Sequence, residues 1–256
     1  MKNENNKDTS WGGVSDWYSN YLDSDNDSYH AKVILPGMLR LIEPKEDMTI
    51  LDLACGEGYF SRAYQGAGSK VFGVDISSEL IALAKKKSNA KISFSVSPSD
   101  DLGSLPDSHF DVVSIVLALQ NINKIKETFD EVSRVLKNGG KFVMVINHPC
   151  FRIPKASSWG FDVKDEKQYR RIDSYASEKK VEIDMNPGSK EKNVTISFHR
   201  SLQFYTKLLS NSGFVITKLE EWISHKKSEK GKRQVEEDRM RKEIPMFMTI
   251  VAEIRK

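Results

Sequence analysis

A glycine turn between an apolar strand and a helix constrains this chain more than any other feature. The run Ile50-Leu51-Asp52-Leu53-Ala54-Cys55-Gly56-Glu57-Gly58 predicts a short strand that ends in a tight turn, and residues 59–64 then predict a helix. Glycine has no Cβ and readily adopts positive φ, so this turn lets a ligand approach the backbone closely. The free N–H groups at the start of a helix attract anionic or polar groups. The turn therefore predicts a cofactor site at the first strand of an open α/β sheet.

The residues around the glycines distinguish two classes of cofactor. A dinucleotide fingerprint has a third glycine where this chain has Ser61, which disfavours a nicotinamide-dependent oxidoreductase but leaves it as an alternative. The pattern here is acidic-x-Ala-x-Gly-x-Gly, starting at Asp52. We expect the Asp52 carboxylate to hold the ammonium group of an amino-acid-like ligand. Asp75 ends a second predicted strand, where a carboxylate accepts both hydroxyls of a ribose.

The rest of the pattern alternates strands with helices. Strands are predicted at 92–96, 112–117, 141–147, 214–219 and 245–254, with helices at 78–84, 123–136 and 201–211. Asn123 is expected to cap the second of these helices, and residues 137–140 to end it. Alternation of this kind predicts a mostly parallel sheet with helices on both faces.

The order of these elements resembles the class I S-adenosylmethionine-dependent methyltransferases, especially the small-molecule branch that includes ubiquinone/menaquinone C-methyltransferases. The resemblance covers about residues 48–147. It implies a Rossmann-like doubly wound sheet of seven strands, mostly parallel, whose last strand is antiparallel beside the fifth. It also implies S-adenosyl-L-methionine as cofactor, S-adenosyl-L-homocysteine as product, and cofactor contacts from Asp52, Ala54, Gly56, Gly58, Phe60, Asp75, Ile76, Ser99, Asp100, Val116 and Gln120.

Four regions are expected. They are an N-terminal tail and aromatic lid at 1–47, the cofactor-binding core at 48–147, an inserted substrate cap at 148–199, and the C-terminal part of the sheet at 200–256. The cap is rich in aromatic residues and arginines, and we expect a hairpin in it from 181–185 and 194–198. Candidate substrate contacts are Tyr18, Tyr21, His30, Arg152, Trp159 and Arg170.

Methyl transfer needs an aligned acceptor and, for some acceptors, a general base. His148, after the fifth strand, and His199, before the next helix, are the candidate catalytic bases, with His30 as a third. Base N-methyltransferases carry an Asn/Asp-Pro-Pro-aromatic loop after the fourth strand, where this chain has Ala118-Leu119-Gln120-Asn121. That difference argues against methylation of nucleic-acid bases and favours a small-molecule acceptor.

Composition leaves several alternatives open. The net charge of +3 permits nucleic-acid binding without arguing for it, although the basic segment 223–245 would serve an RNA or protein methyltransferase. A cofactor-binding protein without catalysis is a further alternative. The two cysteines make no disulfide framework, and no Cys/His cluster has metal spacing. Without a signal core or a membrane-length apolar run, we expect a cytoplasmic monomer or homodimer that uses no metal and no membrane.

Overall fold

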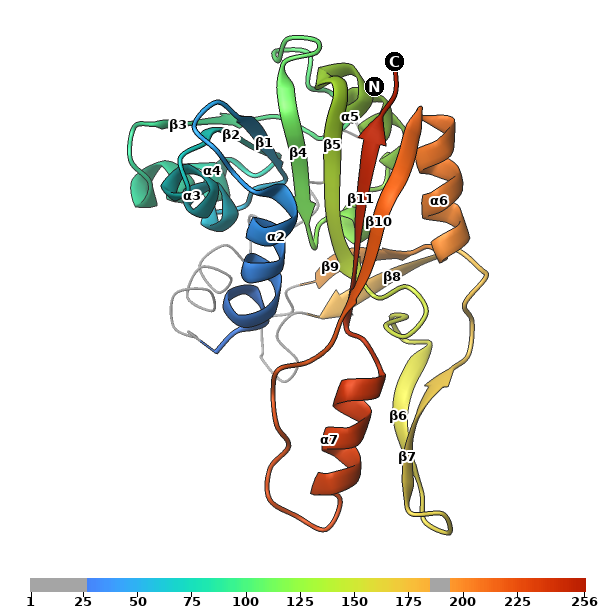
Figure 1. Ribbon diagram of the computed structural model, residues 1–256. Coiled ribbons are helices and arrows are strands. Elements are labelled where there is room, and N and C mark those ends of the chain that lie inside the picture. The colour runs from blue at the N-terminus through green and yellow to red at the C-terminus, as the bar shows by residue number, and fades with distance from the viewer. Residues whose placement is uncertain (1–26, 185–193) are drawn as a thin grey trace.

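The computed structural model of the chain describes residues 27–184 and 194–256. Its centre is a seven-stranded sheet with the order β10-β11-β5-β4-β1-β2-β3 (Figure 1). The strands of this sheet are β1 (Thr49–Leu53), β2 (Lys70–Asp75), β3 (Ile92–Val96), β4 (Phe110–Val116), β5 (Leu136–Asn147), β10 (Phe214–Trp222) and β11 (Phe247–Ile254). β11 lies antiparallel between β5 and β10, whereas the five strands from β5 to β3 are mutually parallel. The predicted fold class, including the antiparallel last strand beside the fifth, is confirmed.

Helices cover both faces of this sheet (Figure 1). The helices of the described residues are η2 (His30–Ile34), α2 (Leu35–Ile42), α3 (Tyr59–Gly66), α4 (Ser78–Lys87), η3 (Leu119–Asn121), α5 (Ile125–Val135), α6 (Leu202–Asn211) and α7 (Gln234–Glu243), of which α7 lies beyond the sheet (Figure 1). α2 and α3 pack on one face, while α5 and α6 pack on the other. Alternate residues of β1 therefore contact different helices, with Ile50 toward α2 and α3, and Leu51 toward α5 and α6.

Residues 30–42, which were expected to belong to the N-terminal lid, pack on the sheet. Ile34 and Met38 are fully buried and belong to the same apolar cluster as Val143 of β5. Complete burial of such a side chain contributes about 1.5–3 kcal/mol. Pro36 lies in the first turn of α2, where its missing N–H has no helical partner to lose. This segment is thus part of the core, while Tyr18 and Tyr21 lie outside the described residues.

Two boundaries differ from the sequence prediction. β5 begins at Leu136, because the backbone turns directly from α5 into the strand and pairs Leu136 with Phe110 before an irregularity in the register. Asn123 does not cap α5. The residue at the N-cap position is Lys124, and its side chain makes no capping hydrogen bond.

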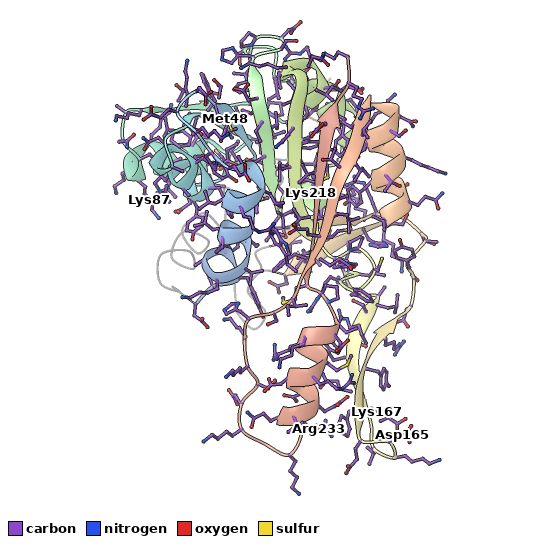
Figure 2. The ribbon with its side chains drawn as sticks, in the orientation of Figure 1. Met48, Lys87, Asp165, Lys167, Lys218 and Arg233 are labelled. Carbon is purple, nitrogen blue, oxygen red and sulfur yellow. The ribbon has the colours of Figure 1, made fainter. Side chains whose placement is uncertain are left out.

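The segment between β5 and α6 folds as two antiparallel hairpins. β8 (Lys179–Asp184) pairs with β9 (Val194–His199), which confirms the hairpin expected there. β6 (Ser157–Asp162) pairs with β7 (Lys167–Ile172), a second hairpin that sequence analysis missed. The second hairpin and α7 extend together beyond the sheet, with Lys167 and Arg233 near their far ends (Figures 1 and 2). The Gln168 N–H donates to Glu236 at 3.0 Å, so α7 packs directly against β7.

Candidate functional site

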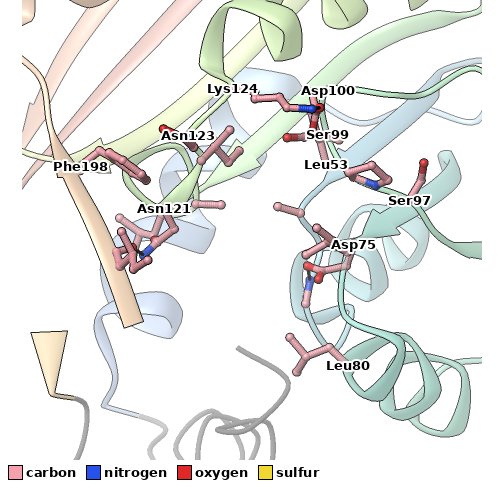
Figure 3. Close-up of a pocket in the computed structure, with 18 of the residues that line it drawn as sticks. Leu53, Asp75, Leu80, Ser97, Ser99, Asp100, Asn121, Asn123, Lys124 and Phe198 are labelled. Atoms are coloured by element: carbon pink, nitrogen blue, oxygen red, sulfur yellow. Dashed lines mark hydrogen bonds and ion pairs between the residues drawn. The ribbon is translucent and has the colours of Figure 1, made fainter. Parts of the chain in front are cut away.

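A cavity of about 370 Å³ lies where the carboxyl ends of β1, β2 and β4 meet. In doubly wound folds, ligands bind at this edge of the sheet, where the strand order reverses. Figure 3 shows Asp75, Leu80 and Ser97 on one side of an open space and Asn121 and Phe198 on the facing side. The lining comes from Leu53, Ala54, Gly56, Asp75, Ile76, Leu80, Ser97, Pro98, Ser99, Asp100, Val116, Leu117, Ala118, Asn121, Ile122, Asn123, Lys124, Lys180, Ile196 and Phe198.

The glycine turn adopts the backbone conformation that the sequence predicted. Gly56 and Gly58 have φ of 56° and 80°, and Gly58 is the N-cap residue of α3. A Cβ at Gly58 would lie 2.8 Å from the Phe94 ring, so no side chain fits there. Gly56 lines the cavity, whereas Gly58 supports the turn from behind it.

Two non-glycine residues at this edge also have positive φ. Ala54 follows β1 with φ of 55°, and Leu117 follows the adjacent strand β4 with φ of 52°. Both line the cavity. Left-handed backbone at a residue with a Cβ costs about 1 kcal/mol or more, and such residues cluster at functional sites. The strained positions therefore agree with the cavity in marking this edge as the candidate site.

Asp75 is held by two backbone donors. One carboxylate oxygen accepts from the Gly56 N–H at 2.9 Å and the other from the Ser77 N–H at 2.9 Å. Ser77 also caps α4 by accepting from the Leu80 N–H at 3.2 Å. These contacts fix the carboxylate at the cavity wall between the glycine turn and α4, the position expected of a ribose-binding group.

Asp52 lies inside the protein and does not line the cavity. Its carboxylate accepts from Ser61 Oγ at 2.6 Å and from Ser114 Oγ at 3.2 Å. Burial raises the pKa of Asp52 to about 6, although both hydroxyls lower it. The geometry supports a structural role that links β1, β4 and α3, and it does not favour direct contact with an ammonium group.

The other residues expected to contact the cofactor fall into two groups, those that line the cavity and those that do not. Ala54, Gly56, Asp75, Ile76, Ser99, Asp100 and Val116 line the cavity. Phe60 packs inside the core near Tyr59 and Tyr64. Gln120 donates from Nε2 to the Leu117 carbonyl at 2.6 Å, so it stabilises its own turn instead of forming a wall.

Neither candidate base faces the cavity. His148 Nδ1 accepts from the Cys150 N–H at 3.2 Å, so its Nε2 carries the proton and donates to Glu221 at 2.7 Å. Burial lowers the pKa of His148 despite the opposing effect of Glu221. With both ring nitrogens engaged, His148 has no lone pair for a substrate. His199 donates from Nε2 to the Tyr175 carbonyl at 2.7 Å, which anchors the start of α6 to the cap.

His30 is also enclosed by the core. Its ring lies 6.3 Å from Tyr59 and 6.0 Å from Phe60 between ring centroids. Burial lowers the pKa of His30 to about 4, so the imidazole is neutral at physiological pH. His30 is not among the residues that line the described cavity.

Sequence analysis missed the wall opposite Asp75. Ile196 and Phe198 of β9 form this wall, and Asn121 ties it to the end of β4 by donating to the Ile196 carbonyl at 2.8 Å. Arg200 stabilises the loop that follows β4. Its guanidinium donates to the carbonyls of Leu119, Ile122 and Asn123 at 3.2, 2.8 and 3.3 Å.

Replacing Arg200 by Met is expected to lower the free energy of unfolding by about 2 kcal/mol, because it leaves buried carbonyls without donors. Arg200 is only 4% exposed, and its ring neighbours Phe198 and Phe204 retain the apolar stem of Met. Urea unfolding measures the loss. Arg200→Lys keeps the positive charge but not the planar guanidinium, so its free energy of unfolding should lie between those of Arg200→Met and wild type. Equal stability of all three proteins would contradict this role.

The described part of the chain contains neither a candidate metal site nor a candidate membrane span. Among residues 27–184 and 194–256, no three or more His, Cys, Asp and Glu side chains are grouped so as to hold a metal ion. None of the helices formed by those residues has the length and apolar character needed to cross a lipid bilayer.

Solved structures share this fold. The S-adenosylmethionine-dependent methyltransferase from Mesorhizobium loti superposes with a TM-score of 0.67 and 26% identity, covering 85% of this chain and 96% of that one. The sheet order and the cavity at the ends of β1, β2 and β4 thus define a Rossmann-like protein of the methyltransferase class. Residues 51–144 match the family described as "Methyltransferase domain". This part of the chain is therefore similar to the domain of that family.

Curated relatives match over part of their length. A demethylmenaquinone methyltransferase from Renibacterium salmoninarum is 36% identical over 105 residues, which are 40% of this chain and 43% of the relative. A malonyl-[acyl-carrier protein] O-methyltransferase from Buchnera aphidicola is 31% identical over 158 residues, 61% of this chain and 58% of the relative. The chain spans between 40% and 60% of the length of the first curated relatives that it matches.

Proposed function

We propose that this protein binds S-adenosyl-L-methionine in the cavity and transfers its methyl group to a small-molecule acceptor. The observation that carries the proposal is the pairing of Asp75 and the Gly56 turn on one side with the β9 wall on the other. The family match favours this reading over the nicotinamide-dependent oxidoreductase that the sequence left open.

The residues present fit the cofactor. The cavity volume of about 370 Å³ is within the range of small-ligand sites. Asp75 offers a carboxylate for the ribose hydroxyls, and Gly56 leaves the backbone open beside it. Ser99 and Asp100, which the resemblance assigns to the cofactor, line the same cavity, and Asp100 pairs there with Lys124 at 2.7 Å.

The bound cofactor supplies an activated methyl group, which an acceptor atom displaces in line. The protein's part is to align the acceptor and to exclude water. The β9 wall, through Ile196 and Phe198, suits both tasks because it places apolar side chains opposite Asp75. The proposal assigns no general base, since the structure engages His148 Nε2 and His199 Nε2 in internal hydrogen bonds.

An apolar wall formed by an inserted hairpin supports a small acceptor more than an RNA or a protein. The basic segment that favoured those larger acceptors is partly neutralised by internal ion pairs. In α7, the Arg239 guanidinium makes two contacts with the Glu236 carboxylate on the exposed surface of the helix. The charges of this segment are therefore typical of a solvated helix.

Calorimetric titration with S-adenosylmethionine, S-adenosylhomocysteine and NAD tests the cofactor. We expect the two adenosyl ligands to bind with micromolar dissociation constants and NAD to give no heat of binding. Binding of NAD alone would overturn the proposal. Methyl-labelled cofactor then tests the acceptor, since the label should enter low-molecular-weight metabolites and leave total RNA and total protein unlabelled. Labelling of RNA or protein instead would show a macromolecular acceptor.

A further inference from the structure

Two arginines of the segment after β5 approach the same indole ring. Arg152 lies in the loop after β5 and Arg170 lies on β7. Their Cζ atoms are 5.9 Å and 5.1 Å from the ring centroid of Trp159 on β6. Both side chains are half-buried, and Trp159 is 37% exposed, so the cluster opens to solvent at one side.

No carboxylate of the described residues pairs with either arginine. Arg170 donates from Nε to the Phe151 carbonyl at 2.8 Å and from Nη2 to Ser157 Oγ at 2.7 Å. Arg152 is less satisfied, because its Nε is buried and has no hydrogen-bond partner within the described part of the chain. The neighbouring Arg171 differs, since it points to the exposed side of β7 and pairs with Asp173 at 2.7 Å.

Within the described part of the chain, no carboxylate compensates the positive charge of this cluster. Burial lowers the pKa of both guanidiniums, and the charge of Arg152 lowers the pKa of Arg170 further. Arg241 of α7, whose Nε donates to Ser228 Oγ at 3.0 Å, also lowers the pKa of Arg152. A guanidinium stays protonated under these conditions, so the folded chain holds like charges together in a half-buried site. That arrangement is unfavourable until an anion completes it.

We propose that Arg152 and Arg170 bind an anionic group, a carboxylate or a phosphate, of the methyl acceptor. The planar fork of a guanidinium matches the oxygen pairs of both groups, and burial strengthens the resulting hydrogen bonds. Arg241 adds positive charge at the border of this site. The inference rests on the proposed function, because it assigns the ligand as an acceptor.

The chain order supports the acceptor as the source of the anion. Arg152 lies five residues beyond Asn147, the last residue of β5, at the same edge of the sheet as the cavity. The segment that carries Arg170 and Trp159 continues into the β8–β9 hairpin, whose Ile196 and Phe198 form the cavity wall. We therefore infer that the arginines hold the anionic group of the acceptor, while the reacting atom of the acceptor lies toward the cofactor cavity.

Thermal unfolding in added anions tests the site without cofactor or acceptor. The probes are sodium phosphate and sodium acetate, each compared with sodium chloride at equal ionic strength. A ligand that binds only the folded state raises its melting temperature by an amount that grows with the logarithm of one plus the ratio of ligand concentration to Kd. The proteins are wild type, the double variant Arg152→Gln/Arg170→Gln, and Arg171→Gln as the matched control on the same strand.

We expect one or both probes to raise the melting temperature of wild type and Arg171→Gln beyond the effect of chloride. The anion that does so identifies a phosphate or a carboxylate as the preferred group. The extra shift should vanish in the double variant, and Arg152→Gln alone should weaken the apparent affinity about tenfold. The single variant also covers the case in which the double variant fails to fold, because Arg152 Nε has no hydrogen-bond partner among the described residues to lose.

Equal shifts in all four proteins would overturn the anion site, since they would reflect exclusion of the salts from the whole surface. Titration of the same variants with S-adenosylmethionine separates this failure from failure of the proposed function. We expect Arg152→Gln/Arg170→Gln to bind the cofactor as wild type does. An anion effect without cofactor binding would instead leave the anion site standing and remove its assignment to a methyl acceptor.

Discussion

The Asp75→Ala variant is expected to bind S-adenosylmethionine at least about 100-fold more weakly than wild type. The reason is the number of hydrogen bonds that one carboxylate supplies. Each ribose hydroxyl donated to a charged acceptor contributes about 1.5–3 kcal/mol, and Asp75 is placed to accept two of them. Burial to 8% exposure shields these bonds from water and keeps them strong. Calorimetric titration of both proteins measures the loss directly.

The control for this variant must separate cofactor contact from damage to the turn. Asp75 also accepts the Gly56 and Ser77 N–H groups, so its removal costs some stability, which thermal unfolding reports independently. Asp101→Ala removes an exposed carboxylate from the same rim but outside the cavity lining, and we expect its affinity to be unchanged. A folded Asp75→Ala variant that binds within about threefold of wild type would exclude the ribose role.

The part of the site that follows from local sequence could be predicted. Gly56 and Gly58 need positive φ, and Asp75 directly ends a short apolar strand, so the turn and the carboxylate have local signals. Because parallel strands bring their carboxyl ends to one edge, these two segments necessarily meet. The seven strands, with the last strand antiparallel beside the fifth, were implied by the resemblance to the methyltransferases.

Side-chain direction was harder to predict. Asp52 looked like a ligand contact because it belongs to the glycine motif, yet it lies on the same side of β1 as Ile50, facing α3. The period-2 alternation of the strand contained this information, and Ser61 nine residues later supplied the hydroxyl. The geometry of Gln120 does not favour its expected cofactor contact for a related reason, since its amide nitrogen donates to the nearby carbonyl of Leu117.

The sequence predicted the hairpin that carries the wall opposite Asp75, but it left no local signal for which of its side chains face the cavity. Phe198 and Ile196 reach the cavity through long-range packing of an inserted hairpin, which sequence spacing does not encode. Arg200 had a weak signal, an arginine between two aromatic residues at the start of a helix. Its three carbonyl partners lie almost eighty residues earlier in the chain, so its role required the structure.

The second large effect concerns pH and the two buried titratable groups, Asp52 and His30. Burial raises the pKa of Asp52 from 3.8 to about 6, so the folded state holds a proton that the unfolded state has released between these values. Stability from this group is present below pH 3.8 and falls by about 3 kcal/mol as pH rises to about 6. Only 2% of Asp52 is exposed, so solvent screening does not reduce the effect much.

His30 acts in the opposite direction over nearly the same range. Burial lowers its pKa from 6.5 to about 4, so here the unfolded state holds the extra proton. Stability from His30 therefore rises by about 3 kcal/mol between pH 4 and pH 6.5. The two contributions almost cancel in wild type, and each single substitution should reveal the other.

Urea unfolding of Asp52→Asn and His30→Phe at pH 4, 5, 6 and 7 separates the two groups. Relative to wild type, Asp52→Asn should gain about 3 kcal/mol as pH rises across this range, because the group that loses stability has been removed. His30→Phe keeps the aromatic contacts with Tyr59 and Phe60 and should lose a similar amount. Comparison with wild type at each pH cancels all other titrating groups. Differences that stay constant with pH would show that neither side chain changes its proton binding on folding, and the buried network of Asp52, Ser61 and Ser114 would then need another explanation.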